Sequence, residues 1–256
     1  MIELINTIKE SILYKYLVIP KNKRSFPIKL IGVGPGDSSL ITIGAIKAIK
    51  QANVIAYPIS SFGSQSISAK IASKYIRYKK HLPIVFPMSN TDSHEDTIWN
   101  NAAQKLLDEA NSGKRVALIC LGDASLFSSA TQIFFRLEKL YDQLEIIPGV
   151  TSISAAASLS KFPIGIKGEQ ILIAETPDSL NKFEELINEA ESKKRVICLL
   201  KLGKRWPWVK SFLKANKLLN NCIICVRIGF EDQLIVNAEQ FQEDKLPYFS
   251  LLLLRF

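Results

Sequence analysis

Residues 28–58, IKLIGVGPGDSSLITIGAIKAIKQANVIAYP, run strand, glycine-rich turn, helix and strand, which is the order of a nucleotide-binding βαβ unit. In such units the turn's backbone N–H groups and the helix N-terminus hold a pyrophosphate. This turn contains Pro35, which has no N–H to donate, and Asp37, whose charge repels phosphate. The second strand ends in Tyr57 and Pro58, not in an acidic residue that could hold a ribose. The turn therefore allows close approach of a ligand without phosphate and argues against a nicotinamide oxidoreductase.

Two further loops carry polar or small residues where a strand is expected to end. In CLGDASLFSS, Gly122 and Asp123 follow a continuous apolar run, and in PGVTSISAAAS the turn at Gly149 leads into a helix that Thr151 or Ser152 can cap. Taken singly, each loop has an ordinary structural explanation, with Asp123 and Thr151 as helix caps and the alanines as packing residues. Ligands of open α/β sheets bind beyond the carboxyl ends of the strands, so three such loops at one edge predict a binding site.

Strand-like and helix-like segments alternate around these loops, which predicts an α/β fold. Up to about residue 149 the alternation is regular and predicts a parallel sheet; Thr42 is the expected N-cap of a helix in which Ile43, Ile46 and Ile49 share one face. Later helices are expected at 178–192 and 208–219, and the closely spaced last strands predict a mixed sheet with antiparallel pairs. The expected division is an extension at 1–27, an N-terminal α/β domain at 28–149 and a C-terminal α/β domain at 150–256.

Composition is that of a soluble globular protein: 256 residues, 47% hydrophobic and 22% charged. No apolar run reaches the roughly 18 residues of a membrane helix, and the first 17 residues have the isoleucine spacing of an amphipathic helix, not a signal peptide. The four cysteines lie in apolar runs, and the pair Cys222 and Cys225 has no second ligand pair, so we expect buried thiols in a reducing cytoplasm and no metal. The net charge of +9 would attract polyanions.

The order and spacing of GVGPGD, LGDASLFSS and IIPGVTSISAAAS resemble the tetrapyrrole methylases over residues 29–256. FPMS at 86–89, the segment from Trp99 to Asp123, the run SLFS at 125–128 and LLKLGKRWPWV resemble the precorrin-2 C20-methyltransferase branch. Two positions depart from the pattern: Ala124 stands where the family has proline, and IAET at 173–176 stands where the branch ends in Pro-Ala-Thr.

The resemblance implies two α/β domains with an active-site cleft between them, a homodimer, and S-adenosyl-L-methionine as methyl donor without a metal. The reaction would be methylation of the polycarboxylate precorrin-2 at C20, giving precorrin-3A in cobalamin biosynthesis. The implied cofactor-binding residues are Pro35, Leu121, Gly122, Asp123, Leu126, Thr151, Ser152 and Leu200. The implied substrate-binding residues are Gly34, Gly36, Asp37, Tyr57, Lys201, Lys204 and Arg205. Asp37 is also a candidate to assist proton loss, with a simple turn residue as the other interpretation.

Other functions remain open at this point. The substrate could be the cobalt-containing counterpart, cobalt-factor II, and the enzyme could be another tetrapyrrole C-methyltransferase. The family's ribosomal RNA ribose methyltransferases are less favoured, because their first loop is asparagine-rich. The net charge of +9 also suggests a non-catalytic nucleic-acid-binding module, but the basic residues lie in scattered short clusters and no nucleic-acid motif is present. We therefore expect neither a nucleic-acid nor a membrane partner.

Overall fold

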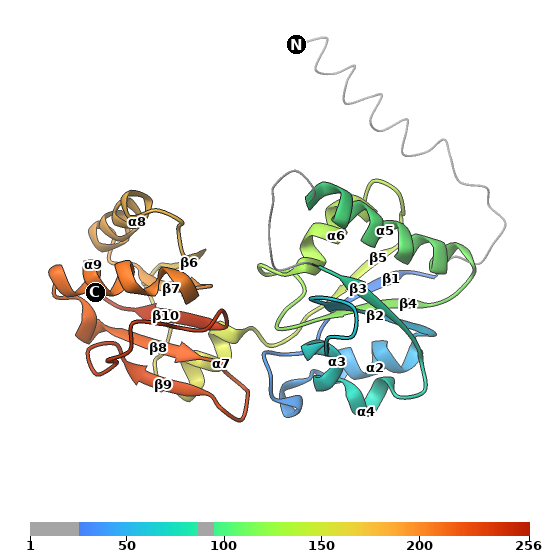
Figure 1. Ribbon diagram of the computed structural model, residues 1–256, viewed down its shortest axis with the longest axis horizontal. Helices are drawn as coiled ribbons and strands as arrows, with labels where there is room; N and C mark the ends of the chain where they lie inside the picture. The colour runs from blue at the N-terminus through green and yellow to red at the C-terminus, as the bar shows by residue number, and fades with distance from the viewer. Residues whose placement is uncertain (1–25, 87–94) are drawn as a thin grey trace, which may run out of the picture.

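The computed structural model describes residues 26–86 and 95–256, and Figure 1 shows two β-sheets with helices packed on them. In the first sheet five parallel strands have the order β3-β2-β4-β1-β5. These strands are β1 (Ile28–Gly32), β2 (Val54–Ile59), β3 (Lys80–Val85), β4 (Val116–Cys120) and β5 (Leu144–Ile147). The predicted parallel sheet is confirmed, and parallel strands bring all their carboxyl ends to one edge.

Helices cover both faces of this sheet, as Figure 1 shows. The elements are the 3-10 helix η1 (Ser38–Leu40), α2 (Ile43–Gln51), α3 (Ile67–Ile71), α4 (Ser73–Ile76), α5 (Glu95–Asn111) and α6 (Ser129–Leu137). Helices α2, α3 and α4 pack on one face, and α5 and α6 pack on the other. Strand β4 is buried along its whole length, which explains why its sequence, VALIC, is apolar without alternation.

Helix α2 begins as predicted but buries a different stripe. The Thr42 hydroxyl accepts a hydrogen bond from the Ala45 amide at 3.0 Å, which confirms the N-cap. The buried residues are Ala45, Ala48 and Ile49, whereas Ile43 is 72% exposed. Successive residues turn by about 100°, so Ile43 lies roughly opposite Ala45 on the helix. The small alanines let α2 approach the sheet closely.

The second sheet is mixed, with the order β6-β7-β10-β8-β9, as the closely spaced C-terminal strands predicted. Its strands are β6 (Ile171–Glu175), β7 (Val196–Leu200), β8 (Cys222–Val226), β9 (Leu234–Asn237) and β10 (Ser250–Leu254). Strands β6 and β7 are parallel, and the other three neighbouring pairs are antiparallel. The C-terminal strand β10 lies in the middle of the sheet and is fully buried, which accounts for its sequence SLLLL.

Three α-helices pack on the second sheet: α7 (Ser152–Leu159), α8 (Leu180–Ser192) and α9 (Trp206–Ala215). Two 3-10 helices, η3 (Gly203–Arg205) and η4 (Leu219–Asn221), flank α9. Helices α8 and α9 share a core with one face of the sheet, while α7 packs against the other. Helix α9 begins two residues earlier than predicted because Pro207 fits a first helical turn. It ends before Lys217, whose φ of +59° is left-handed.

All four cysteines are buried, as expected. Cys222 and Cys225 belong to cores on opposite faces of the second sheet, so these two thiols do not converge on one site. Burial raises the pKa of the Cys120 thiol to about 12 and that of Cys198 to about 11. The thiols are therefore neutral and serve as packing residues.

Some predictions fall on residues that are not described. The expected N-terminal helix, residues 1–25 of the extension and residues 87–89 of the FPMS motif lie outside the described residues. The domain boundaries at 27 and 149 stay predictions, although residue 150 lies between β5 and α7. In the described part of the chain, no helix is both long and apolar enough to cross a membrane.

Candidate functional site

The three loops meet at the carboxyl edge of the first sheet, where their backbones pass one another at Gly32, Gly122 and Gly149. A Cβ atom built on Gly149 would lie 2.3 Å from the Gly122 carbonyl oxygen, and one built on Gly32 would lie 2.6 Å from the same atom. Both distances are too short for any side chain. The loops after β1, β4 and β5 therefore approach one another closely only because glycine stands at both positions.

The first loop (Val33 to Asp37) is joined to the second (Leu121 to Ser128) by backbone hydrogen bonds. Gly34 and Gly122 form an isolated antiparallel bridge. The Gly34 amide donates to the Gly122 carbonyl at 3.1 Å, and the Gly122 amide donates back at 2.8 Å. Both residues have positive φ, +86° and +73°, which favours glycine. Pro35, the next residue, is buried and donates no N–H in this turn.

Asp123 joins the second loop to the third (Pro148 to Thr151). One carboxylate oxygen accepts the Gly149 amide at 2.7 Å, and the other accepts the Ser125 amide at 2.8 Å and the Ser125 hydroxyl. Asp123 is 8% exposed, and these three donors compensate the cost of burying its charge. It is not a helix cap, because Ser128 caps α6. Asp123 thus holds two of the loops together.

The third loop is fixed at both ends. The Thr42 hydroxyl, which caps α2, also donates to the Pro148 carbonyl at 3.2 Å. The Thr151 hydroxyl accepts from the Ser154 amide at 3.0 Å, so Thr151 is the N-cap of α7, as expected, and Ser152 is the first helical residue.

Open space lies beside Gly122 in the middle of this arrangement. A Cβ atom built there would meet no atom within 4 Å, in contrast to Gly32 and Gly149. The site is thus crowded on one side of the Gly122 backbone and open on the other, which is the geometry expected where a ligand approaches a main chain.

The loops also contact the second sheet. A Cβ atom built on Gly36 would lie 2.7 Å from the Gly229 carbonyl carbon, so the first loop lies directly against the turn after β8. Leu126 of the second loop and Leu200 at the end of β7 pack on the same apolar cluster, whose buried members include Ile153 and Ala155 of α7. The structure therefore brings together residues from both sheets that the sequence predicted for one cofactor site. Leu121, in contrast, packs on the α2 side of the first sheet.

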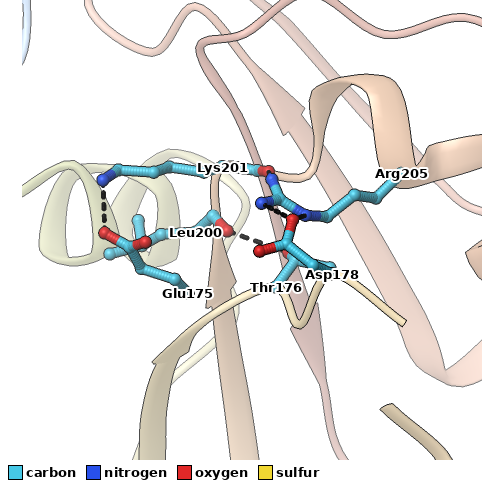
Figure 2. A network of polar contacts seen from close by, with 6 residues as sticks. All are labelled: Glu175, Thr176, Asp178, Leu200, Lys201 and Arg205. Carbon is cyan, nitrogen blue, oxygen red and sulfur yellow. Dashed lines mark hydrogen bonds and ion pairs between the residues drawn. The ribbon is translucent and has the colours of Figure 1, made fainter. Parts of the chain in front are cut away.

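Charged residues gather at the edge of the second sheet, as Figure 2 shows. The Lys201 ammonium pairs with Glu175. Arg205 donates from Nε to Asp178 at 3.0 Å and from Nη1 to the Lys201 carbonyl at 2.9 Å. Thr176, which is 2% exposed, donates its amide and its hydroxyl to the Leu200 carbonyl at 2.9 and 2.8 Å. Two of the three predicted substrate-binding cations thus already have carboxylate partners, while Lys204 has none among the described residues.

Asp37 and Tyr57 both have local partners. The Asp37 carboxylate accepts the Ser39 amide at 2.7 Å, and this hydrogen bond holds its pKa below the usual range. A lowered pKa keeps Asp37 ionised at neutral pH but makes it a weaker proton acceptor. The Tyr57 hydroxyl lies 3.1 Å from Nδ1 of His81, on neighbouring strand β3. The catalytic role of Asp37 and the substrate contact of Tyr57 stay predictions.

Comparison with known proteins decides the family. Residues 27–241 match the family described as Tetrapyrrole (Corrin/Porphyrin) Methylases.

The chain belongs to the tetrapyrrole methylase family.

Among curated relatives, the chain is 30% identical over 228 residues to the cobalt-precorrin-2 C(20)-methyltransferase of Salmonella typhimurium, covering 87% of this chain and 93% of that protein. It is 30% identical over 235 residues to the cobalamin biosynthesis protein CobIJ of Mycobacterium tuberculosis, covering 88% of this chain but only 45% of that longer protein. It is 28% identical to the cobalt-precorrin-4 C(11)-methyltransferase of Priestia megaterium, covering 82% of this chain and 77% of that protein.

Two solved structures illustrate the shared fold. The methyltransferase CobJ superimposes with a TM-score of 0.68 at 18% identity, covering 90% of this chain and 94% of that chain. The uroporphyrin-III C-methyltransferase of Thermus thermophilus, crystallised with S-adenosyl homocysteine, superimposes with a TM-score of 0.62 at 17% identity, covering 89% and 97%. At these identities the likeness concerns the fold alone.

The site depends on several residues for which the sequence predicted no binding role. Gly32 and Gly149 are needed for the crossing, although Gly149 was expected only as a turn residue. Ser125 holds Asp123, and Gly229 contacts the first loop. Glycines at the ends of two strands are a visible signal for a close approach. No sequence signal pairs Gly36 with Gly229, because they lie almost 200 residues apart.

Replacing Gly149 by alanine should destabilise the fold by about 1–3 kcal/mol, since the new Cβ atom would overlap the Gly122 carbonyl and force the backbone apart. Gly44→Ala is the matched control: its Cβ would have ordinary contacts at 3.8 Å, and alanine favours the helix, so stability should stay equal or rise by up to about 1 kcal/mol. Urea denaturation measures both. Equal stabilities of Gly149→Ala and wild type would contradict the crowded crossing.

Asp123→Asn should lower the free energy of unfolding by about 1–3 kcal/mol, because the amide presents a donor where Asp123 now accepts only. Asp142→Asn removes the same charge from an exposed position and should leave stability within about 0.5 kcal/mol of wild type. If both variants unfold at the wild-type denaturant concentration, Asp123 does not hold the loops together.

Proposed function

We propose that this chain is an S-adenosyl-L-methionine-dependent methyltransferase that methylates precorrin-2 at C20, giving precorrin-3A in cobalamin biosynthesis. The observation that carries the proposed C20 position is the similarity to the Salmonella C(20)-methyltransferase, which extends over nearly the whole of both chains. The metal-free substrate is proposed because a Sinorhizobium protein named precorrin-2 C(20)-methyltransferase is 26% identical over 231 residues. The three loops that carry most of the implied cofactor residues meet at one sheet edge, and this convergence supports the proposal physically.

The proposed cofactor site is the open space beside Gly122. Leu126 of the same loop and Leu200 belong to one apolar cluster, and Thr151 and Ser152 begin α7 at the third loop. Pro35 in the buried first turn fits a ligand that carries no phosphate. Leu121 and Asp123 act through the second loop's backbone position. We propose that these residues bind the cofactor, and that no metal takes part.

When bound, S-adenosylmethionine supplies an electrophilic methyl group on its sulfonium. The chain's task is to align that methyl with C20 and to exclude water. In the proposed reaction a carbon–carbon bond would form at C20 as the methyl group left the sulfonium, and C20 would then lose a proton. Asp37 is exposed at the end of the first loop and ionised at neutral pH, so we propose that it relays the proton to water, although its lowered pKa makes it a weak acceptor.

The substrate is proposed to lie where the first loop faces the edge of the second sheet. Gly34, Gly36 and Asp37 would border it on one side, and Tyr57 is a further candidate. Lys201, Lys204 and Arg205 would attract its carboxylates on the other side. Lys204 supports this proposal best, since its ammonium has no carboxylate partner among the described residues.

Two alternatives have a specific observation in their favour. The Salmonella relative's name specifies a cobalt-containing substrate, and the Priestia relative's name specifies C11 as the methylated carbon. A nucleic-acid-binding module and a ribosomal RNA methyltransferase have no such support. The buried, unpaired thiols fit a reducing compartment, so we propose a cytoplasmic location.

With EDTA present, the protein should bind S-adenosylmethionine and S-adenosylhomocysteine in calorimetry. It should transfer one methyl group to C20 of precorrin-2, located by mass spectrometry and NMR. Parallel incubations with cobalt-factor II and cobalt-precorrin-4 distinguish the alternatives. Methylation of the latter at C11, or a strict metal requirement, would contradict the proposal.

We further propose a homodimer formed through exposed apolar side chains at the start of edge strand β6. Ile171 and Ile173 are 43% and 38% exposed, and Ile166, which follows a glycine in contact with Ile171, is 62% exposed. Such grouped apolar side chains are typical of protein interfaces.

Light scattering should give a molar mass of twice 28.7 kDa, the mass of two chains. Ile173→Glu should yield monomers, whereas Leu140→Glu, at a 63% exposed site elsewhere, should not. A wild-type monomer would refute this assembly.

A further inference from the structure

The ion pairs at the edge of the second sheet differ in how firmly they are held. Arg205 uses Nε, Nη1 and Nη2 on internal partners, two of these nitrogens on Asp178 and one on the Lys201 carbonyl. All three guanidinium nitrogens therefore have partners within the protein, and these hydrogen bonds stabilise the turn. Lys201 and Glu175 make only one contact with each other, and neither side chain forms another hydrogen bond among the described residues.

Hydrogen bonds hold together the two strand ends that carry this weaker pair. Glu175 and Leu200 are register partners on parallel strands β6 and β7. Both Thr176 donors bond to the Leu200 carbonyl, and this connects the two strand ends directly next to the pair. Figure 2 shows Glu175 and Lys201 extending together away from Arg205. Only the side chains need to move for the pair to open.

Opening the pair should cost little. The Lys201 side chain is 32% exposed and that of Glu175 is 40% exposed, so both charges remain hydrated when they separate. A carboxylate that replaced Glu175 would recreate the same kind of contact with Lys201, while Glu175 turned into solvent.

We propose that Glu175 is a specificity-determining residue: it occupies Lys201 until a carboxylate of the polycarboxylate substrate displaces it. Because Glu175 is tethered next to Lys201, its effective concentration there is high, and an isolated small carboxylate competes poorly. A tetrapyrrole that also engages Lys204 brings its own carboxylate to Lys201 intramolecularly and can displace Glu175. The ion pair therefore favours binding of polycarboxylates at Lys201 over binding of single small carboxylates. This inference rests on the proposed function.

The test uses the full-length protein and uroporphyrin III, a stable tetrapyrrole polycarboxylate, with acetate, which has a single carboxylate, as the small competitor. Glu175→Gln should bind uroporphyrin III about two- to fivefold more tightly than wild type at low salt, because Lys201 no longer has an internal competitor. Acetate should displace the porphyrin from Glu175→Gln at lower concentration than from wild type, because Glu175 no longer competes with it for Lys201. In a Lys201→Gln background the Glu175→Gln change should have no effect, as in a double-mutant cycle.

Glu189→Gln is the matched control. It makes the same charge change on α8, where Glu189 pairs with Lys193 and Arg195, and it measures the effect of net charge alone. Equal affinities of Glu175→Gln and Glu189→Gln would overturn the inference, as would weaker binding by Glu175→Gln, which indicates that Glu175 only orients Lys201. Failure of the proposed function gives a different result, namely wild-type protein that binds neither uroporphyrin III nor S-adenosylmethionine.

Discussion

The close crossing of three loops at Gly32, Gly122 and Gly149 is the constraint on which the candidate site depends. Strand β1 lies between β4 and β5, so the three strands end side by side and their loops must share one small volume. Glycine at two of the positions removes the side chains that would keep the backbones apart. The Gly34–Gly122 bridge and the Asp123 carboxylate then supply the hydrogen bonds that the crowded backbone would otherwise lack. On the other side of Gly122 the backbone stays open, with no atom within 4 Å of the position of a Cβ.

The same loops connect the first sheet to the second. Gly36 lies against Gly229, while Leu126 and Leu200 meet on the apolar cluster below α7. A cofactor between these residues would contact both sheets at once, and a substrate at the same edge would face the cations of the second sheet. Of these, Arg205 and Lys201 have carboxylate partners, so the positive charge there is organised by the protein before any polyanion arrives. The net charge of +9 says nothing about that arrangement.

Much of the architecture followed from local patterns. The apolar run VALIC predicted a buried strand, and the close spacing of the last strands predicted the antiparallel pairs of the mixed sheet. Thr42 and Thr151 were recognisable as caps because a capping hydroxyl acts on amides two or three residues away. Two details differ from the predictions: which residues of α2 are buried, and where α9 begins and ends. Both depend on how closely the helix approaches its sheet.

By itself the sequence determined the order of strands and helices, the glycine and proline turns, and the motifs that identify the family, since each of these is set by residues close together in the chain. Only the tertiary structure decided that Asp123 holds Gly149, that Gly36 meets Gly229 and that Glu175 occupies Lys201. These contacts depend on which strands become neighbours and on the register between them. The order of the strands depends on burying both faces of each sheet under helices. That requirement involves the whole chain, so no short segment of the sequence reveals it.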